Sequence, residues 1–273
     1  MKKLIAMVLA LCMVLAFAGC ASEKPAETTA APTEAATEAP TEAATEAATE
    51  AATEAAEVSV MTHEEFMAAA VDTEVTVETY VQAKQGWWDN KATIYSQAED
   101  GAYFLYNMTC TEEEYAQLTE GTKIRVTGFK TEWAGEVEIV DATFEFVEGN
   151  YVAEALDITE MLPDTDALLA HQNEKIVATG LTVAPSTDAE GNEAAFLYNW
   201  DGSGAEGTDS DLYFKVTSGD QTYTFVIEYY LCNETTDAYK AVQALKVGDV
   251  IDLEGFLYWY EGAQPHVTSI TVK

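Results

Sequence analysis

Two nine-residue segments of this chain share one pattern, and this repeat constrains the fold more than any other feature. Residues 121–129 align with residues 248–256 without a gap, and a further glycine follows at the same spacing, at Gly135 and Gly262. Gly128 and Gly255 fall inside the two matched segments, and glycine within a strand usually marks a bulge or a sharp bend. The repeat therefore predicts two copies of a strongly curved β unit. A chance match between two generic strand–glycine–strand segments is the alternative.

Local patterns place the elements around the first motif. Residues 62–65 read Thr-His-Glu-Glu, a capping box that predicts a helix continuing to residue 70. Residues 74–83 alternate apolar and polar side chains, as a half-buried strand does. The other elements expected in the first copy are strands at residues 91–97, 102–106, 122–130 and 136–147, and a helix capped by Thr111.

The second copy repeats this order with one addition. A helix is expected at residues 166–172, and strands are expected at 174–184, 211–217, 222–230 and in the second glycine motif. An insertion at residues 185–210 carries an added strand at 194–200 and a loop rich in Asp and Gly. Residues 106–110 parallel residues 228–232, so Cys110 and Cys232 occupy equivalent positions. We expect two buried thiols there, with a disulfide as the alternative for an exported protein.

The order strand, strand, strand, helix, strand, strand is that of the OB-fold barrel. The expected fold is mainly β, with two tandem OB-fold-like five-stranded barrels, each with short helices, at residues 58–149 and 150–273. The chain resembles tandem OB-fold modules of bacterial exported lipoproteins of unknown function, and the strands at 126–129 and 253–256 carry this resemblance. The resemblance implies a ligand face on the second and third strands and their adjoining loops.

The N-terminal residues have the layout of a lipoprotein signal peptide. Lys2 and Lys3 precede an uncharged apolar run over residues 4–18, which is short for a membrane span. Ala18 and Gly19 then precede Cys20, which resembles a lipobox, although Phe17 stands where that family prefers Leu. We therefore expect a signal peptide at 1–19, a lipid on Cys20, and a protein anchored on the extracellular side of a bacterial membrane. An ordinary signal peptide cut nearby is the alternative.

A low-complexity segment separates Cys20 from the predicted barrels. Over residues 20–57 the chain repeats Thr-Glu-Ala-Ala or Thr-Glu-Ala-Pro without an aromatic residue. Glutamates four residues apart repel each other on a helix, and Pro32 and Pro40 interrupt the first half. The segment is expected to be an acidic linker that extends the reach of the folded part.

The charge of the chain is strongly negative. There are 48 acidic residues against 13 basic ones, for a formal net charge of −35. Nucleic-acid binding normally relies on clustered Lys and Arg that release counterions from phosphates. On this basis we expect no nucleic-acid partner, and we expect the membrane, an extracellular ligand or an envelope protein instead.

Aromatic side chains are the main candidates for ligand contact. Trp87 and Trp88 are adjacent, so both cannot point inward from extended chain, and an exposed aromatic ring can stack on a sugar or anchor a protein. The alternative is that the tryptophans only plug and cover the barrel. The candidate ligand-binding residues are Trp87, Trp88, Tyr95, Tyr103, Trp133, Trp200, Tyr213 and Trp259.

Motifs for metal binding and catalysis are weak. Asp201, Asp209 and Asp211 supply oxygen atoms of the kind calcium prefers, but their spacing fails the EF-hand pattern. Calcium is therefore a weak possibility, and no cofactor is expected. The three histidines are scattered, and no catalytic motif accompanies them.

The function expected from the sequence is that of a membrane-anchored extracellular binding module rather than an enzyme. Its ligand could be a glycan, a peptide, a cation or an envelope protein. The alternatives are an OB-fold nucleic-acid binder and a hydrolase of the cell envelope.

Overall fold

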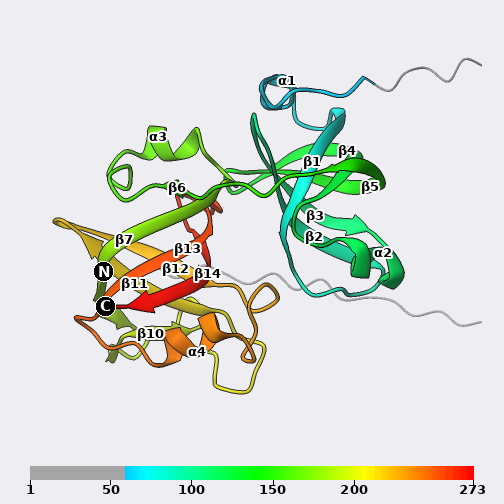
Figure 1. Ribbon diagram of the computed structural model, residues 1–273. Coiled ribbons are helices and arrows are strands. Elements are labelled where there is room, and N and C mark those ends of the chain that lie inside the picture. The colour runs from blue at the N-terminus through cyan, green and yellow to red at the C-terminus, as the bar shows by residue number, and fades with distance from the viewer. Residues whose placement is uncertain (1–58) are drawn as a thin grey trace, which may run out of the picture. The chain divides into compact units, whose positions relative to one another are not determined.

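The computed structural model describes residues 59–273 (Figure 1). The predicted signal peptide, Cys20 and the acidic linker lie outside the described residues. The part that is described belongs to one compact unit, which contains both predicted copies.

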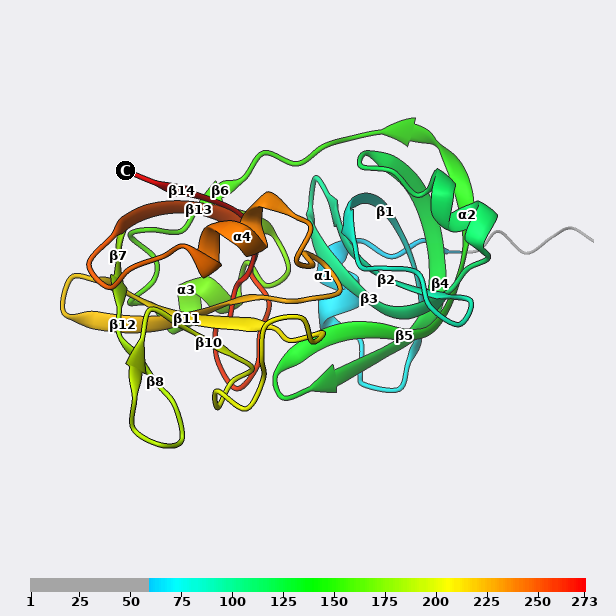
Figure 2. The ribbon, with the colours of Figure 1, turned by 90° about the horizontal axis from the view of Figure 1, so that it is seen from below.

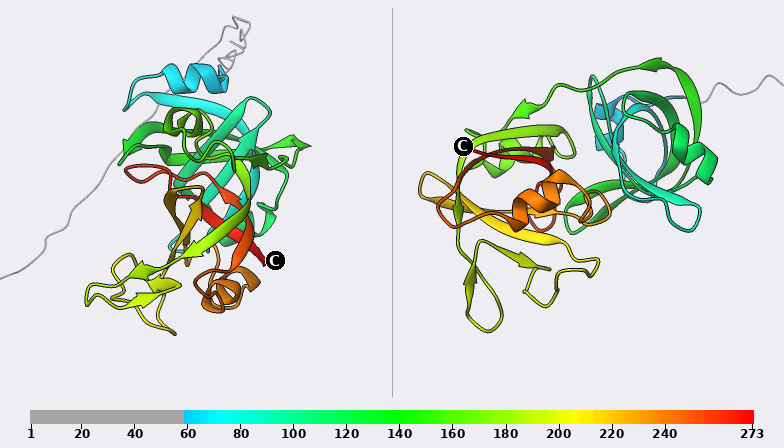
Figure 3. Two further views of the ribbon diagram at one scale, coloured as in Figure 1. Left: turned by 90° about the vertical axis from the view of Figure 1, so that its left-hand side faces the viewer. Right: turned by 60° about the horizontal axis from the view of Figure 1, so that its bottom comes forward.

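Five strands of the first copy close into a barrel. They are β1 (Glu74–Lys84), β2 (Lys91–Ala98), β3 (Gly101–Thr109), β4 (Thr122–Trp133) and β5 (Glu136–Asn150). Their order around the ring is β1-β2-β3-β5-β4, with β4 pairing again with β1, and β3 and β5 are parallel. Figure 3 (right) shows this ring end-on. The mainly-β class and one closed five-stranded barrel are therefore confirmed.

The barrel closes because alternate residues of each strand point into one apolar core. Val75, Val77 and Val81 of β1 are buried, and Ile124 and Val126 of the paired strand β4 are buried with them. Val77 lies opposite Val126 in the register of the two strands. The alternation read from the sequence thus marks the inner face of the barrel wall.

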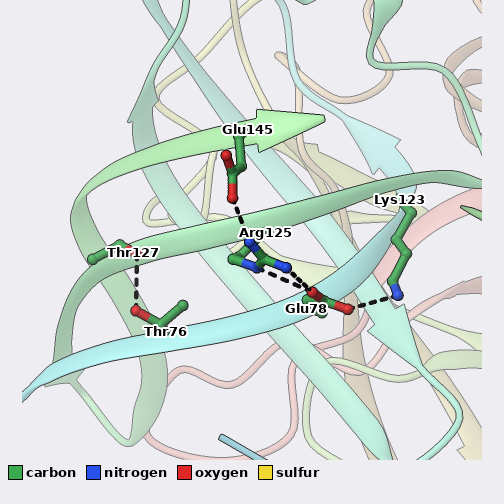
Figure 4. Close-up of polar contacts among 6 residues, drawn as sticks. All are labelled: Thr76, Glu78, Lys123, Arg125, Thr127 and Glu145. Atoms are coloured by element: carbon green, nitrogen blue, oxygen red, sulfur yellow. Dashed lines mark hydrogen bonds and ion pairs between the residues drawn. The ribbon is translucent and has the colours of Figure 1, made fainter. Parts of the chain in front are cut away.

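Ion pairs cross the outer face of the same strands (Figure 4). Arg125 of β4 donates from Nη2 to Glu78 Oε1 of β1 at 2.7 Å and from Nη1 to Glu145 Oε1 of β5 at 2.6 Å. Lys123 Nζ lies 2.6 Å from Glu78 Oε2. Arg125 lies opposite both glutamates in the strand registers, so the side chains reinforce the pairing that brings them together.

Two capping boxes start the short helices of the first copy, as predicted. The helices are α1 (His63–Ala68) and α2 (Glu112–Gln117). Thr62 accepts from the backbone amide of Glu65, while Glu65 accepts from the amide of Thr62. The other end of α1 meets Lys130, which is only 6 % exposed and donates from Nζ to the carbonyl oxygens of Met67 at 2.7 Å and Ala69 at 2.8 Å. Lys130 thus satisfies carbonyl groups that the end of a helix leaves free.

Replacing Lys130 with methionine is expected to lower the free energy of unfolding by about 2 kcal/mol, because these charge-assisted hydrogen bonds are lost and the carbonyl groups stay behind. Chemical denaturation of the variant measures this loss. Lys273→Met is the control, because Lys273 makes only a surface ion pair with Asp252 and its loss is worth about 1 kcal/mol or less. Equal losses in the two variants would contradict the role given to Lys130.

The second copy forms a seven-stranded sheet in the order β10-β11-β12-β14-β13-β7-β6, with an additional pairing between β11 and β7. Its long strands are β7 (Lys175–Ala184), β11 (Leu212–Ser218), β12 (Gln221–Ile227), β13 (Val250–Phe256) and β14 (His266–Val272). The strands β6 (Leu156–Asp157) and β10 (Phe196–Tyr198) lie at its two ends, and the helices are α3 (Thr165–Leu169) and α4 (Asp237–Gln243). Helix α4 packs against β14, β11 and β12 (Figure 2).

The insertion is built differently from the prediction. Instead of one strand at 194–200, it holds the small hairpin of β8 (Ser186–Thr187) and β9 (Glu193–Ala194), followed by β10, which pairs with β11. A second difference concerns residues 228–232, which form a turn, whereas their counterparts 106–110 lie mostly in β3. The carboxylate of Glu228 accepts from the amides of Tyr230 and Leu231, which stabilises this turn and ends β12 early.

The two motif glycines lie at irregularities of the strand registers, as predicted. The register of β4 against β5 shifts between Thr127 and Phe129, around Gly128. The register of β13 against β14 shifts at Gly255. A Cβ atom on Gly128 would lie 2.7 Å from the carbonyl oxygen of Val140, and one on Gly255 would overlap the carbonyl group of His266. The neighbouring strand thus approaches closely at both positions, which only glycine permits.

Polar side chains join the two copies. The hydroxyl of Tyr95 on β2 lies 2.6 Å from Nδ1 of His266 on β14, and both residues are buried. The ring of Tyr95 also stacks on Phe256 of the second copy, with 4.6 Å between the ring centroids. Nearby, Gln172 donates to the carbonyl oxygen of Gly135 at 2.8 Å and accepts from the amide of Val137. The copies are therefore held by specific contacts and not by the connecting chain alone.

Candidate functional site

A groove with a volume of about 1350 Å³ lies between the two copies. Strands β2, β3 and β5 of the first copy line one wall, and β11, β12 and the loops after β12 and β13 line the other. The backbone amide of Gly86 donates to the carbonyl oxygen of Tyr230 at 2.8 Å, so the walls touch. The groove includes the second and third strands of each copy, which is the face the resemblance implied.

Exposed aromatic rings dominate this groove. Trp88 is 72 % exposed, Trp133 is 54 % exposed and Trp200 is 75 % exposed, and all three line it. Large apolar side chains seldom gather in the open on one face without a binding role. Further aromatic residues that line the groove are Phe104, Tyr106, Tyr213, Tyr230, Tyr258 and Tyr260.

The adjacent tryptophans Trp87 and Trp88 have different environments, as expected for neighbours in extended chain. Trp88 points into the groove, whereas Trp87 is half-buried and donates from Nε1 to the carbonyl oxygen of Cys110 at 3.0 Å. Trp87 also packs against the core of the first barrel while lining the groove. Tyr213, another predicted residue, is half-buried in the groove, and burial raises the pKa of its hydroxyl to about 12.

Three of the predicted ligand-binding residues are core residues, and those predictions were wrong. Tyr95 is fully buried between the copies, and Tyr103 is 1 % exposed inside the first barrel. Trp259 is 7 % exposed, although it lies in the turn after the second motif glycine as the exposed Trp133 lies after the first. The two tryptophans differ because the Trp259 ring packs on Gly135 of the other copy and its amide donates to Glu136 at 2.9 Å.

Three carboxyl groups line the groove, and two of them have structural partners. Asp211 accepts from the amide of Tyr229 at 2.8 Å, and Glu228 accepts from the amides of Tyr230 and Leu231. Burial raises the pKa of Asp211 and raises that of Glu228 to about 7. Glu138 of β5 is 7 % exposed, and burial raises its pKa to about 7. No pattern in the sequence selects these acids, since a chain with 48 acidic residues always supplies neighbouring pairs.

Glu136, the first residue of β5, is fully buried and should make the stability of the protein depend on pH. Burial raises its pKa from 4.5 to about 8, although one carboxylate oxygen accepts from the backbone amide of Trp259 at 2.9 Å. The stability that this carboxyl group contributes is therefore fully present below about pH 4.5 and is lost as pH rises through about 8. Glu138 and Glu228, whose pKa values are also raised, likewise make the stability fall as pH rises. Burial lowers the pKa of His266 to about 3, which makes the stability rise with pH, but only below the ordinary histidine value of 6.5.

We expect the melting temperature of the protein to fall as pH rises from about 6.5 to 8.5, because ionised Glu136 is poorly solvated in this range. Glu136→Gln should reduce that slope. Thermal unfolding followed by circular dichroism across this pH range measures both effects. A control, Glu132→Gln on an exposed strand end, should leave the slope unchanged. Equal slopes in the wild type and Glu136→Gln would contradict the assignment.

The aspartates proposed for calcium do not converge. Asp201 accepts a hydrogen bond from the amide of Ser203 at 3.0 Å, and Asp211 accepts one from the amide of Tyr229. Asp209 is exposed. Within residues 59–273, no group of three or more His, Cys, Asp or Glu side chains is placed to hold a metal ion. Calcium binding stays a weak prediction from the sequence. Cys110 and Cys232 are free and buried, so the disulfide alternative is not realised.

Sequence reasoning missed the tyrosines that complete the groove. Tyr106 is 45 % exposed, Tyr230 is 59 % exposed and Tyr260 is 41 % exposed, and these rings come from three different loops or strands. The ring of Tyr260 lies 5.1 Å from that of Trp133, across the boundary between the copies. Only the packing of one copy on the other brings them together, and no local pattern in the sequence encodes it.

Comparisons with known proteins found similar structures but no matching family. No protein-family model matches the chain, and no curated protein matches it. Similar structures include the tetrameric p202 HIN2 domain, with 11 % identity and a TM-score of 0.33 over 75 % of this chain and 96 % of that one. The Ifi202 HINa domain in complex with 20bp dsDNA has 13 % identity and a TM-score of 0.32 over 75 % of this chain and 97 % of that one. At these values the similarity carries neither a ligand nor a function to this chain.

One expectation from the sequence is nevertheless corrected. The net charge led to the prediction that nucleic acid is not a partner, whereas the similar structures include HIN domains in complex with double-stranded DNA. The exclusion is withdrawn on physical grounds, because net charge describes the whole surface and not the stacking groups of one groove. No helix in residues 59–273 has the length and apolar character needed to cross a membrane.

Proposed function

We propose that this chain is a lipid-anchored extracellular module that binds carbohydrate in the aromatic groove between its two copies. The anchor is the lipid predicted on Cys20, and the acidic linker at residues 20–57 gives the module its reach. The proposed role is binding and not turnover.

The observation that carries this proposal is the cluster of exposed tryptophans in one groove. Trp88, Trp133 and Trp200 come from separate segments, yet all three line the same space and are more than half exposed. Sugar rings have apolar faces that pack on flat aromatic side chains, and the rigid indole loses little entropy on binding. Several separate rings suit a chain of sugars better than one small ligand.

Polar groups of the groove supply the other half of carbohydrate recognition. Sugar hydroxyl groups donate hydrogen bonds, and Asp211, Glu138 and Glu228 are carboxylate acceptors at the groove wall. Ser186, Thr187 and Gln264 add hydroxyl and amide groups to the same space. A groove with stacking faces and a few fixed polar groups matches the general anatomy of small-molecule sites.

We further infer that the second copy is an OB-like barrel that has gained an insertion. Its long strands pair in the order β7-β11-β12-β14-β13, with β13 returning to β7, which parallels β1-β2-β3-β5-β4 in the closed barrel. The groove then lies where the second and third strands of two barrels face each other. That arrangement supports a single extended ligand spanning both copies.

Single-stranded nucleic acid is the second candidate, because its bases also stack on exposed aromatic rings. Lys91 and Lys215 line the groove and could contact phosphate groups. The aromatic cluster favours both ligands, while the three carboxyl groups favour the carbohydrate.

Calorimetric titration of the full-length protein in detergent tests the proposal against its rival. The ligands are soluble chitin oligosaccharides and single-stranded DNA, each also titrated into the Trp88→Ala/Trp200→Ala variant. Saturable binding of the oligosaccharide that the variant loses would support the proposal. Binding of the DNA alone, lost in the same variant, would replace carbohydrate with nucleic acid. Oligosaccharide binding that survives in the variant would overturn the groove as the site.

A further inference from the structure

Glu138 is an unusual acid because it is almost buried and yet has no partner. It is 7 % exposed and lines the groove, so the part of it that solvent reaches faces that space. Within residues 59–273, its carboxylate receives no hydrogen bond and forms no ion pair, whereas Asp211 and Glu228 accept from backbone amides. A buried carboxylate without a partner is costly, which is why its pKa rises to about 7.

Aromatic residues line the groove beside Glu138. Glu138 lies opposite Phe104 in the parallel pairing of β3 and β5, and Phe104 lies 5.4 Å from Tyr258 between ring centroids. Tyr258 and Glu138 line the same groove, and the pKa of Tyr258 is raised by burial first and then by the charges of Glu136 and Glu138. Tyr106 stacks beside Phe104 at 6.3 Å. The Glu138 side chain thus lines the groove together with Phe104, Tyr106 and Tyr258.

An organic ammonium group fits this arrangement better than a neutral group or a metal ion. A cation is attracted to the faces of aromatic rings and forms a charge-assisted hydrogen bond with a carboxylate. A neutral hydroxyl group would leave the charge of Glu138 uncompensated. A metal ion needs several converging ligands, and no set of three ligating side chains occurs within residues 59–273.

We propose that Glu138 makes the groove selective for saccharides that carry free amino groups. The ammonium group of a hexosamine lies against the Glu138 carboxylate beside Tyr106 and Tyr258, while neighbouring sugar rings stack on the exposed tryptophans. This inference rests on the proposed carbohydrate-binding function and names the class of sugar.

The test compares chitin oligosaccharides with the same oligosaccharides after full deacetylation, so that the ligands differ only in their amines. Calorimetry uses the full-length protein in detergent at a pH of about 7, near the pKa of Glu138, so that its carboxylate form is populated while the amine can still hold a proton. The salt concentration is about 0.15 M to screen long-range attraction. The deacetylated ligand should bind about tenfold more tightly or better, as one charge-assisted contact implies. Glu138→Gln should bring this ratio close to one, whatever it does to the affinity for the acetylated ligand.

The control variant separates a local contact from the general negative charge. Glu132→Gln removes the same charge from an exposed position on the adjoining strand, outside the groove lining, and should keep the ratio. The inference would be overturned if both variants lost the preference for the deacetylated ligand equally, or if Glu138→Gln kept the affinity ratio of the wild type. Binding of both ligands with equal affinity would overturn it while leaving the proposed function in place. Failure of both ligands to bind would overturn the proposed function as well.

Discussion

Replacing Trp88 and Trp200 with alanine is expected to weaken carbohydrate binding about a hundredfold or more, while the fold stays intact. An aromatic ring that a ligand covers is worth about 1–3 kcal/mol, and two such losses multiply. The two side chains are 72 % and 75 % exposed, so their removal leaves no internal cavity. Calorimetric titration measures the affinity, and thermal unfolding checks the fold.

A matched control distinguishes groove aromatics from exposed aromatics in general. Phe146 on β5 is 42 % exposed but lies outside the groove lining, and its ring packs beside that of Phe144 on the same strand. Phe146→Ala should keep the affinity of the wild type. If the double variant bound as well as Phe146→Ala, the tryptophans would not be the ligand platform.

Replacing Gly255 with alanine is expected to lower the free energy of unfolding by about 3 kcal/mol or more, or to prevent folding of the second copy. The new Cβ would overlap the carbonyl group of His266 and press on the backbone of Val267, and a backbone neighbour cannot move aside as a flexible side chain can. The displaced strand also carries the His266 contact with Tyr95. Chemical denaturation measures the loss.

The control for this variant is Gly86→Ala. A Cβ on Gly86 would meet only the carbonyl oxygen of Tyr230, at an ordinary 3.9 Å. This substitution should therefore change the free energy of unfolding by less than about 1 kcal/mol. If both variants lost a similar amount of unfolding free energy, the close approach of β14 would not be the reason for glycine at position 255.

Much of the fold follows from local patterns in the sequence. The capping boxes at Thr62 and Thr111, the alternation in β1 and the two strand glycines each produce the structure they predict. These features work because each depends on neighbours within a few residues or on one paired strand. The same logic correctly predicted that one of two adjacent tryptophans must face outward.

Features that depend on the contact between the copies could not be predicted in this way. Trp133 and Trp259 both lie in the turns after the motif glycines, yet only Trp259 is buried, because Gly135 and Glu136 of the other copy cover it. Tyr95 was expected to face a ligand, but His266 and Phe256 enclose it. The repeat predicts similar environments for side chains at matching places in the two copies. The two copies pack on each other asymmetrically, so these environments differ. The groove and its unpartnered Glu138 are products of the same packing.

The most direct test of the account is a titration followed through the indole N–H signals in a ¹H–¹⁵N NMR spectrum. The chain has five tryptophans, so every signal can be assigned by single substitutions. On saturation with deacetylated chitin oligosaccharides, the account predicts shifts at the groove-lining Trp88, Trp133 and Trp200 and an unchanged signal at the buried Trp259. Saturable binding that leaves those three signals unmoved, or that moves Trp259 alone, would contradict the groove as the binding site.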